Sequence, residues 1–411
     1  ITYDYTTGGD TPQMRSRTVA SGAPFASQVG TIDYMYESHD FLWKALDSKA
    51  GEPDYVYEYD EIGNITKASD GTDTVYYGYN RAGELCWSGP GAGSAGSQLG
   101  QTCSATPSGT GYATYTRDGA GNSQGRSGST YTTNERNQVT GIDGVTMSYR
   151  DQGNDLRFSG GPLGREVVGP LGLTAAKTGS TVTYVTRDPD GKILSVRRGG
   201  TRYNYAIEPN GNVTWIMNPS GTVLAGYKYS PYGKTTVLGT DPIAAANKFR
   251  WLSSLQNTTS GGADGHYKLG ARYYDSQGHF TQPDPVAGGL SDPRTLTSYN
   301  YAGGDPINQS DPTGYKPGPT GRCDYQLYAY DVPYYCERLG VGINGAQAAN
   351  PVQCGAFMFG TLFFAGAASY YLLSASIVEA GVSIASNGFA FAFGAPQGLS
   401  DAKQQYCGPQ P

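Results

Sequence analysis

The chain has 411 residues, of which 60 are Gly, 34 are Tyr and only 16% are charged. Gly is about twice as frequent as in an average protein, which argues against a helical bundle. Three His leave too few imidazoles for a metal site of several His, and we expect neither a metal nor a cofactor. The net charge of -6 provides no basic footprint, so we expect no nucleic-acid partner.

A short motif recurs through the first 250 residues. It consists of two aromatic residues separated by one position, a turn rich in Asp, Asn, Pro and Gly, and an alternating apolar run. Alternating Tyr and β-branched residues favour strands, and Pro and Gly favour tight turns, so each copy predicts a β-hairpin. No sustained 3.6-residue period precedes residue 285, which predicts short helices or none. The clearest copies begin at Tyr55, Tyr76, Tyr184 and Tyr203, with weaker ones near Tyr34, Tyr131 and Tyr149.

These hairpins predict a mainly β fold in which one long sheet hides its edges by closing or spiralling into a hollow shell. The alternative is several β-sandwiches in tandem, but aliphatic residues are too sparse to fill many sandwich cores. The chain begins at Ile1 without a recognisable export signal, so we expect residues 1–250 to be the C-terminal part of a longer shell.

Two cysteines bracket a Gly- and Ser-rich stretch within this repeat region. Cys86 and Cys103 are separated by residues that offer little apolar surface against which a free thiol could be buried. A disulfide would close this loop in an oxidising compartment, whereas the alternative is a pair of free loop thiols. We expect the disulfide.

Three short motifs follow the repeats: RYYD at 272–275, PDP at 283–285 and DPTG at 311–314. A Pro after Asp restricts the Asp to an extended backbone, so the carboxylate projects from a rigid turn. Two carboxylates held close together cannot both ionise easily, and one can then activate a water molecule, as in aspartic proteases. The alternative is that the Asp-Pro turns only shape loops, which is how we interpret Asp275, Asp292 and Asp305.

The segments YEYDEIGN and YGYNRAGEL resemble tyrosine-aspartate (YD) repeats, and residues 267–314 are similar to the core domain associated with rearrangement hotspot (RHS) repeats. The resemblance covers the chain as far as Gly314. It implies a spiral β-sheet cocoon that encloses a variable C-terminal toxin. It also implies that residues 251–315 form the core domain that closes the shell and carries an autoproteolytic site.

The same resemblance assigns roles to individual residues. Asp284 and Asp311 would share a proton and activate water, and Arg272 would steady the carboxylate pair or the oxyanion. Cleavage would fall between Tyr315 and Lys316, after the DPTG motif.

Residues 316–411 differ in composition from the repeats and predict a separate small module, the variable toxin. Residues 355–378 contain no charge and are long enough for a helix that crosses a bilayer. We expect a membrane-disrupting helical toxin; the alternative is a buried helix in a small disulfide-linked domain. The tail has no His, which disfavours a metal- or His-dependent enzyme. Its disulfide candidates are Cys323, Cys336, Cys354 and Cys407.

The combined prediction is an RHS-type polymorphic toxin of a bacterium, secreted or held at the cell surface and used in competition between bacteria. Its partners would be its own C-terminal toxin as enclosed cargo, an immunity protein and a target membrane. The alternatives are a YD-repeat adhesin with a membrane-anchoring tail, and a toxin whose tail is an enzyme of unknown type.

Overall fold

The computed structural model describes residues 1–5, 13–91, 103, 107, 109–126, 128–150, 157–169, 172–188, 191–257, 266–286, 297–315 and 318–319. The chain divides into two units, Ile1–Tyr328 and Ala329–Pro411, and every described residue belongs to the first. The predicted domain limits at 250/251 and 315/316 stay predictions. The apolar segment 355–378 and the tail cysteines Cys323, Cys336, Cys354 and Cys407 lie outside the described residues.

Within these residues, thirteen strands form one large sheet in which each strand pairs with the next along the chain. Antiparallel neighbours throughout this sheet agree with a series of hairpins. Its strands are β1 (Thr2–Tyr5), β2 (Met14–Val19), β3 (Gly30–Tyr36), β4 (Leu42–Asp47), β5 (Tyr55–Tyr59), β6 (Ile65–Ser69), β7 (Thr74–Tyr79), β8 (Leu85–Gly89), β9 (Ala113–Arg117), β10 (Ser123–Arg126), β11 (Ser129–Thr133), β12 (Val139–Ile142) and β13 (Val145–Thr146).

A second large sheet has eight described strands in the same consecutive order. They are β16 (Arg165–Gly169), β17 (Gly172–Thr178), β18 (Thr181–Arg187), β19 (Ile193–Arg198), β20 (Thr201–Ile207), β21 (Val213–Met217), β22 (Val223–Tyr229) and β23 (Thr235–Leu238). Three small sheets complete the strands: β14 (Ser148–Tyr149) with β15 (Arg157–Ser159); β24 (Leu255–Asn257), β25 (His266–Leu269) and β26 (Arg272–Tyr274); and β27 (Gln309–Ser310) with β28 (Gly318–Pro319).

Helical structure is brief in the described residues. The only α-helix among them is α1 (Pro242–Ala246), capped by the Asp241 carboxylate, which accepts from the Ile243 N–H. Short 3-10 turns occupy Ala26–Gln28, Trp251–Ser253 and Ala302–Gly304. The predictions of a mainly β fold and of short helices are therefore confirmed for this part of the chain.

Many of the hairpins share one five-residue loop, which explains the turn signal in the sequence. In the loops that begin at Asp60, Asp118 and Glu208, the first residue's N–H donates to the fifth residue's carbonyl and the fourth residue's N–H donates back to the first carbonyl. The fourth residue has a positive φ, 86° at Gly63 and 84° at Gly121, which Gly adopts without a Cβ clash. The loop adds one residue to a strand and produces a bulge beside the turn.

The hairpins that the repeat predicts are all present. The clear copies form the pairs β5/β6, β7/β8, β18/β19, β20/β21 and β22/β23. The weaker copies near Tyr34, Tyr131 and Tyr149 form β3/β4, β11/β12 and β14/β15.

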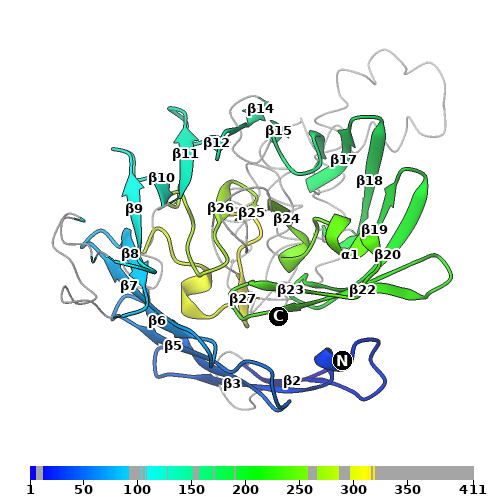
Figure 1. Ribbon diagram of the computed structural model, residues 1–411, viewed down its shortest axis with the longest axis horizontal. Helices are drawn as coiled ribbons and strands as arrows, with labels where there is room; N and C mark the ends of the chain where they lie inside the picture. The colour runs from blue at the N-terminus through cyan, green and yellow to red at the C-terminus, as the bar shows by residue number, and fades with distance from the viewer. Residues whose placement is uncertain are drawn as a thin grey trace, which may run out of the picture. The chain divides into compact units, whose positions relative to one another are not determined.

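Both large sheets bury one face against the segment that follows them. In Figure 1 the strands β24–β26 lie between the blue-to-cyan sheet and the green sheet. Leu42, Ile65 and Leu85 of the first sheet share a core with Trp251 and Tyr274. A second core joins strands β16–β22 to α1 and β24. This arrangement matches the predicted shell, with the later segment packed on its inner side.

Buried Tyr residues explain the unusual composition. Their rings fill the core where aliphatic residues are few, and their hydroxyls need partners when they are buried. Tyr59 and Tyr232 bond through their hydroxyls at 2.8 Å. Tyr79 donates to the carbonyl of Ile65, and Tyr274 donates to the carbonyl of Tyr232. Tyr therefore contributes both apolar area and hydrogen bonds between separate elements.

The predicted disulfide between Cys86 and Cys103 is present, with the Cα atoms 5.2 Å apart. It closes the loop between β8 and β9, and both cysteines pack beside Trp87. Among the described residues, no helix has the length and apolar character needed to cross a membrane.

Candidate functional site

The three predicted site residues come together around one guanidinium. Arg272 begins β26 and is buried. Its Nη2 lies 2.9 Å from Oδ2 of Asp284 and 3.0 Å from Oδ2 of Asp311. The guanidinium also stacks on the ring of Phe280, with the two centres 3.5 Å apart. A buried Arg requires paired charges, and these two carboxylates supply them.

The PDP turn is held in place through a backbone carbonyl. Ser298 accepts two hydrogen bonds at its carbonyl oxygen, one from Arg272 Nη1 at 3.0 Å and one from the Asp284 N–H at 2.9 Å. Asp284 Oδ1 accepts from the Val286 N–H at 2.8 Å. The Asp284 carboxylate therefore presents Oδ2 to Arg272 while Oδ1 closes its own turn.

The DPTG turn is organised by the other carboxylate. Asp311 Oδ1 accepts from the Thr313 hydroxyl at 3.0 Å and from the Tyr315 N–H at 3.2 Å. The Thr313 carbonyl accepts from the Ala271 N–H, which docks this turn on the residue before Arg272. These bonds leave Asp311 Oδ2 directed at the guanidinium.

Gly314 is required by this close approach. Its φ is +67°, and a Cβ built on it would lie 2.4 Å from the Leu269 carbonyl oxygen and 2.8 Å from the Arg272 nitrogen. No side chain fits at that distance. The Gly of the motif therefore lets the turn approach the strand that carries Arg272.

The predicted cleavage point lies in a loop closed by two short strands. β27 pairs with β28 in the register Gln309↔Pro319 and Ser310↔Gly318. Tyr315 is on the described part of this loop, whereas Lys316 lies outside the described residues. The register nevertheless brings the backbone on the two sides of the Tyr315–Lys316 bond together.

The two carboxyls have different surroundings. Asp311 is fully buried, whereas the Asp284 side chain keeps 17% of its surface exposed. Burial raises the pKa of Asp284 to about 6; Arg272 and the Val286 N–H oppose this rise, and the charge of Asp311 adds to it. Asp284 therefore gains a proton in mildly acidic solution, at a higher pH than an ordinary Asp does.

Sequence analysis did not identify several residues that shape the site. Ser298, Phe280 and Tyr301 contact Arg272 or Asp311, with the Tyr301 hydroxyl 3.3 Å from the Asp311 nitrogen. No motif contains them, because the contacts come from tertiary folding. Thr313 is inside DPTG and could have been identified from its position two residues after the acid.

Two other acids near the site, Asp275 after β26 and Asp305 before Pro306, bond groups of their own loops. Asp275 accepts from the N–H groups of Gln277 and His279, and Asp305 accepts from Asn308. Asp292 lies outside the described residues. No group of His, Cys, Asp and Glu in the described part of the chain could hold a metal ion.

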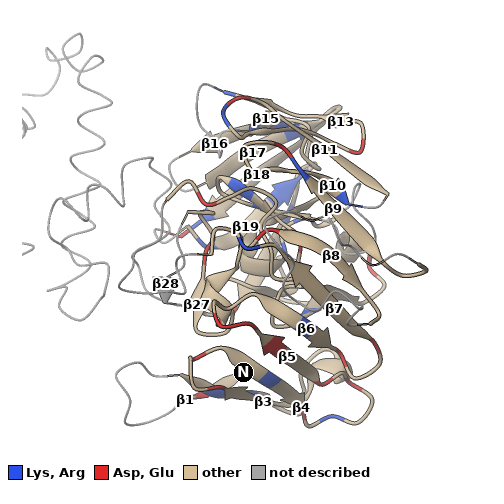
Figure 2. Cartoon of the chain, turned by 90° about the vertical axis from the view of Figure 1, so that its left-hand side faces the viewer, with Lys and Arg blue, Asp and Glu red and all other residues tan. Residues whose placement is uncertain are grey.

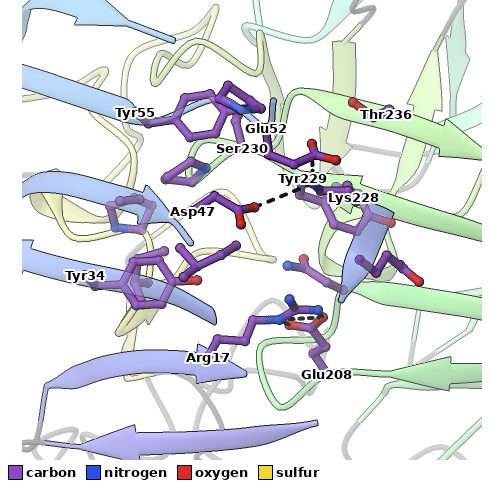
Figure 3. A pocket seen from close by; sticks show the side chains of 18 of the residues that line it. Arg17, Tyr34, Asp47, Glu52, Tyr55, Glu208, Lys228, Tyr229, Ser230 and Thr236 are labelled. Atoms are coloured by element: carbon purple, nitrogen blue, oxygen red, sulfur yellow. Dashed lines mark hydrogen bonds and ion pairs between the residues drawn. The ribbon is translucent and has the colours of Figure 1, made fainter. Parts of the chain in front are cut away.

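A separate polar cavity of about 110 Å³ lies between the two large sheets (Figure 3). Two ion pairs cross it: Arg17 of β2 bonds Glu208 at 2.6 Å, and Lys228 of β22 bonds Glu52 at 2.5 Å. Asp47 lies 3.7 Å from the same Lys228 nitrogen. Each cation of the cavity pairs with a carboxylate of the other sheet. We therefore interpret these ion pairs as contacts that hold the two sheets together.

Comparison with known proteins gives partial similarities. No family model matches the chain. It is 30% identical over 143 residues to the tRNA3(Ser)-specific nuclease WapA of Bacillus spizizenii, covering 34% of this chain and 6% of that protein. It is 31% identical over 137 residues to salivary gland surface protein 1 of Aedes aegypti, covering 33% and 4%. The tRNA nuclease WapA of Bacillus subtilis is 26% identical over 143 residues, covering 34% and 6%.

Among solved structures, the TcdB2-TccC3-TEV crystal structure matches with a TM-score of 0.46 at 14% identity, over 76% of this chain and 18% of that chain. TcdB2-TccC3-Cdc42 matches with the same TM-score at 15% identity, also over 76% and 18%. The chain thus spans a small part of each of these proteins. The nuclease activity in the WapA names belongs to those proteins, of which this chain covers 6%.

Proposed function

We propose that the chain is the C-terminal part of an RHS-type toxin, in which a β-shell encloses residues 316–411 and cuts them free after Tyr315. The observation that carries this proposal is the buried contact of one guanidinium with Asp284 and Asp311. Two carboxylates that face one nitrogen, from two Asp-Pro turns, have the composition of an aspartic-protease centre. The similarity to WapA sequences also supports a toxin of this kind.

In the proposed reaction, ionised Asp311 takes a proton from water as the water oxygen attacks the carbonyl carbon of Tyr315. Protonated Asp284 gives its proton to the carbonyl oxygen. The tetrahedral intermediate then collapses, the carbon–nitrogen bond to Lys316 breaks, and the leaving nitrogen takes a proton from the carboxyl pair. The products are a Tyr315 carboxyl group and a new amino terminus at Lys316.

Arg272 has two roles in this scheme. Its Nη2 lies 3.0 Å from Asp311 Oδ2 and places a positive charge beside the proposed base. Its Nε is buried without a hydrogen-bond partner among the described residues, so one donor remains for negative charge that develops during the reaction.

Asp311→Asn removes the proposed base, so it is expected to abolish release of residues 316–411 from the full chain. Gel electrophoresis of the purified protein measures the release. Asp305→Asn is a matched control, because Asp305 is a buried acid that precedes Pro but contacts Asn308 rather than Arg272. A fragment released from Asp311→Asn, with circular dichroism matching the wild type, would exclude the proposed carboxylate pair.

The cleavage rate is expected to fall as the pH rises above about 6. Asp284 must hold a proton to act as the acid, and its pKa is raised to about 6. Each further pH unit lowers the protonated fraction about tenfold. Chain purified in denaturant and refolded by dilution at pH 5 to 8 gives the rate, normalised to the folded fraction by Trp fluorescence. A rate that rises with pH would assign Asp284 the opposite role.

For the tail we propose membrane disruption, which rests on the uncharged segment 355–378. A second candidate is RNA cleavage, favoured by the relatives named as tRNA nucleases. We further propose that the protein is secreted or held at the surface of a bacterium, that an immunity protein protects the producer, and that enclosure keeps the tail inactive until delivery.

The two candidates for the tail predict different outcomes for the released fragment of the full chain. Membrane disruption predicts that the fragment releases dye from liposomes and leaves purified tRNA intact. A nuclease predicts tRNA fragments without dye release. Uncleaved Asp311→Asn protein serves as the control in both assays, because its tail would stay attached and enclosed. Cleaved tRNA with intact liposomes would contradict the membrane proposal.

A further inference from the structure

The outer face of the second large sheet has an unusual distribution of charge. Residues 157–207 contain eight Lys and Arg against three Asp and Glu, although the whole chain is acidic. Figure 2, which views the molecule from the side of the first sheet, shows blue segments of the ribbon near the labels β15 to β19. Four of the cations, Arg165, Lys177, Arg197 and Arg202, are exposed on strands β16, β17, β19 and β20.

These four cations share one face with Val167 and Tyr184, and we call these six residues the basic outer face. The strand register gives the grouping: Arg165 pairs with Lys177, and Arg197 pairs with both Tyr184 and Arg202. The adjacent residues along each strand point to the opposite side, toward the core. They are Glu166, Ala176, Val185, Val196 and Tyr203.

Folding alone does not account for this pattern. Arg165 stands directly opposite Lys177, and Arg197 directly opposite Arg202, and like charges in such positions destabilise a sheet. None of the four cations forms an ion pair with another described residue. In described β16–β20 the one acid is Glu166, which is buried and bonded to Arg157. Arg165 lies over the ring of Phe158, 5.7 Å from its centre, but no acid of this part of the chain pairs with the four cations.

The apolar residues on this face are also exposed. Val167 keeps 50% of its surface in solvent and Tyr184 keeps 53%. The register places both in one row that crosses five strands through Ala175, Arg197 and Arg202. With strands about 4.8 Å apart, the row is about 19 Å long. This row, with Arg165 and Lys177 in the neighbouring row of the same face, combines attraction to anionic headgroups with side chains suited to the membrane interface.

We propose that the basic outer face docks the shell on a bilayer that contains anionic phospholipids. The cations approach the headgroup phosphates, and Val167 and Tyr184 enter the interfacial layer between them. Nucleic acid shares the phosphate chemistry, but half-exposed Val167, an aliphatic side chain at one end of the row, fits a lipid interface better than a stack of bases. This docking does not depend on cleavage or on the activity of the tail.

The test is co-sedimentation of the full chain with vesicles of phosphatidylcholine alone or of equal parts phosphatidylcholine and phosphatidylglycerol. The expected result is binding to the anionic vesicles only, which weakens as salt is added. Arg197→Glu with Arg202→Glu is expected to reduce this binding tenfold or more. The matched control is Arg81→Glu with Arg136→Glu, two exposed turn residues of the first sheet, which changes the net charge equally and should bind as the wild type does.

The tail is identical in all these proteins, so any membrane affinity of its own cancels in the comparison. Single Arg202→Glu places opposite charges across from each other, so it is expected to raise the thermal midpoint while it weakens vesicle binding. A variant that is more stable yet binds vesicles more weakly has lost docking and not folding. Equal binding to neutral vesicles, or equal loss in the control pair, would overturn the proposal. A double-stranded oligonucleotide that displaced the protein from vesicles would also overturn it and assign the face to nucleic acid.

Discussion

The buried guanidinium of Arg272 is the interaction on which the site depends. It lies on a short strand in the interior of the β-sheet unit, where an unpaired charge would cost several kcal/mol. Asp284 and Asp311 satisfy it from two separate turns, and the Ser298 carbonyl ties one of these turns to the same Arg. The charge that must be neutralised for folding therefore assembles the two carboxyls that the proposed chemistry needs.

The local structure of the shell could be predicted from sequence because the repeat specifies its own turns. Gly at the fourth loop position, as at Gly63 and Gly121, fixes a positive φ, and alternating Tyr residues fix the strands beside it. The pairing of Arg272 with Asp284 and Asp311 was expected from family resemblance. The supporting contacts of Phe280 could not be predicted, because they arise only when distant strands pack.

The two faces of the second sheet serve different purposes. The inner face buries aliphatic and Tyr side chains against α1 and β24, and this packing holds the later segment inside. The outer face retains like-charged cross-strand pairs, such as Arg197 with Arg202, that folding alone would not favour. The ion pair of Arg17 with Glu208 joins this sheet to the first one, so the positions of the two sheets are coupled.

The central claim is that the chain cuts itself after the DPTG turn. N-terminal sequencing of the smaller fragment from purified, wild-type full chain tests it most directly. The account predicts a single new terminus that begins at Lys316, because the Asp311 carboxylate is bonded to the Tyr315 N–H one residue before that bond. A fragment that begins elsewhere, or a folded chain that stays intact at pH 5 to 6, would contradict it.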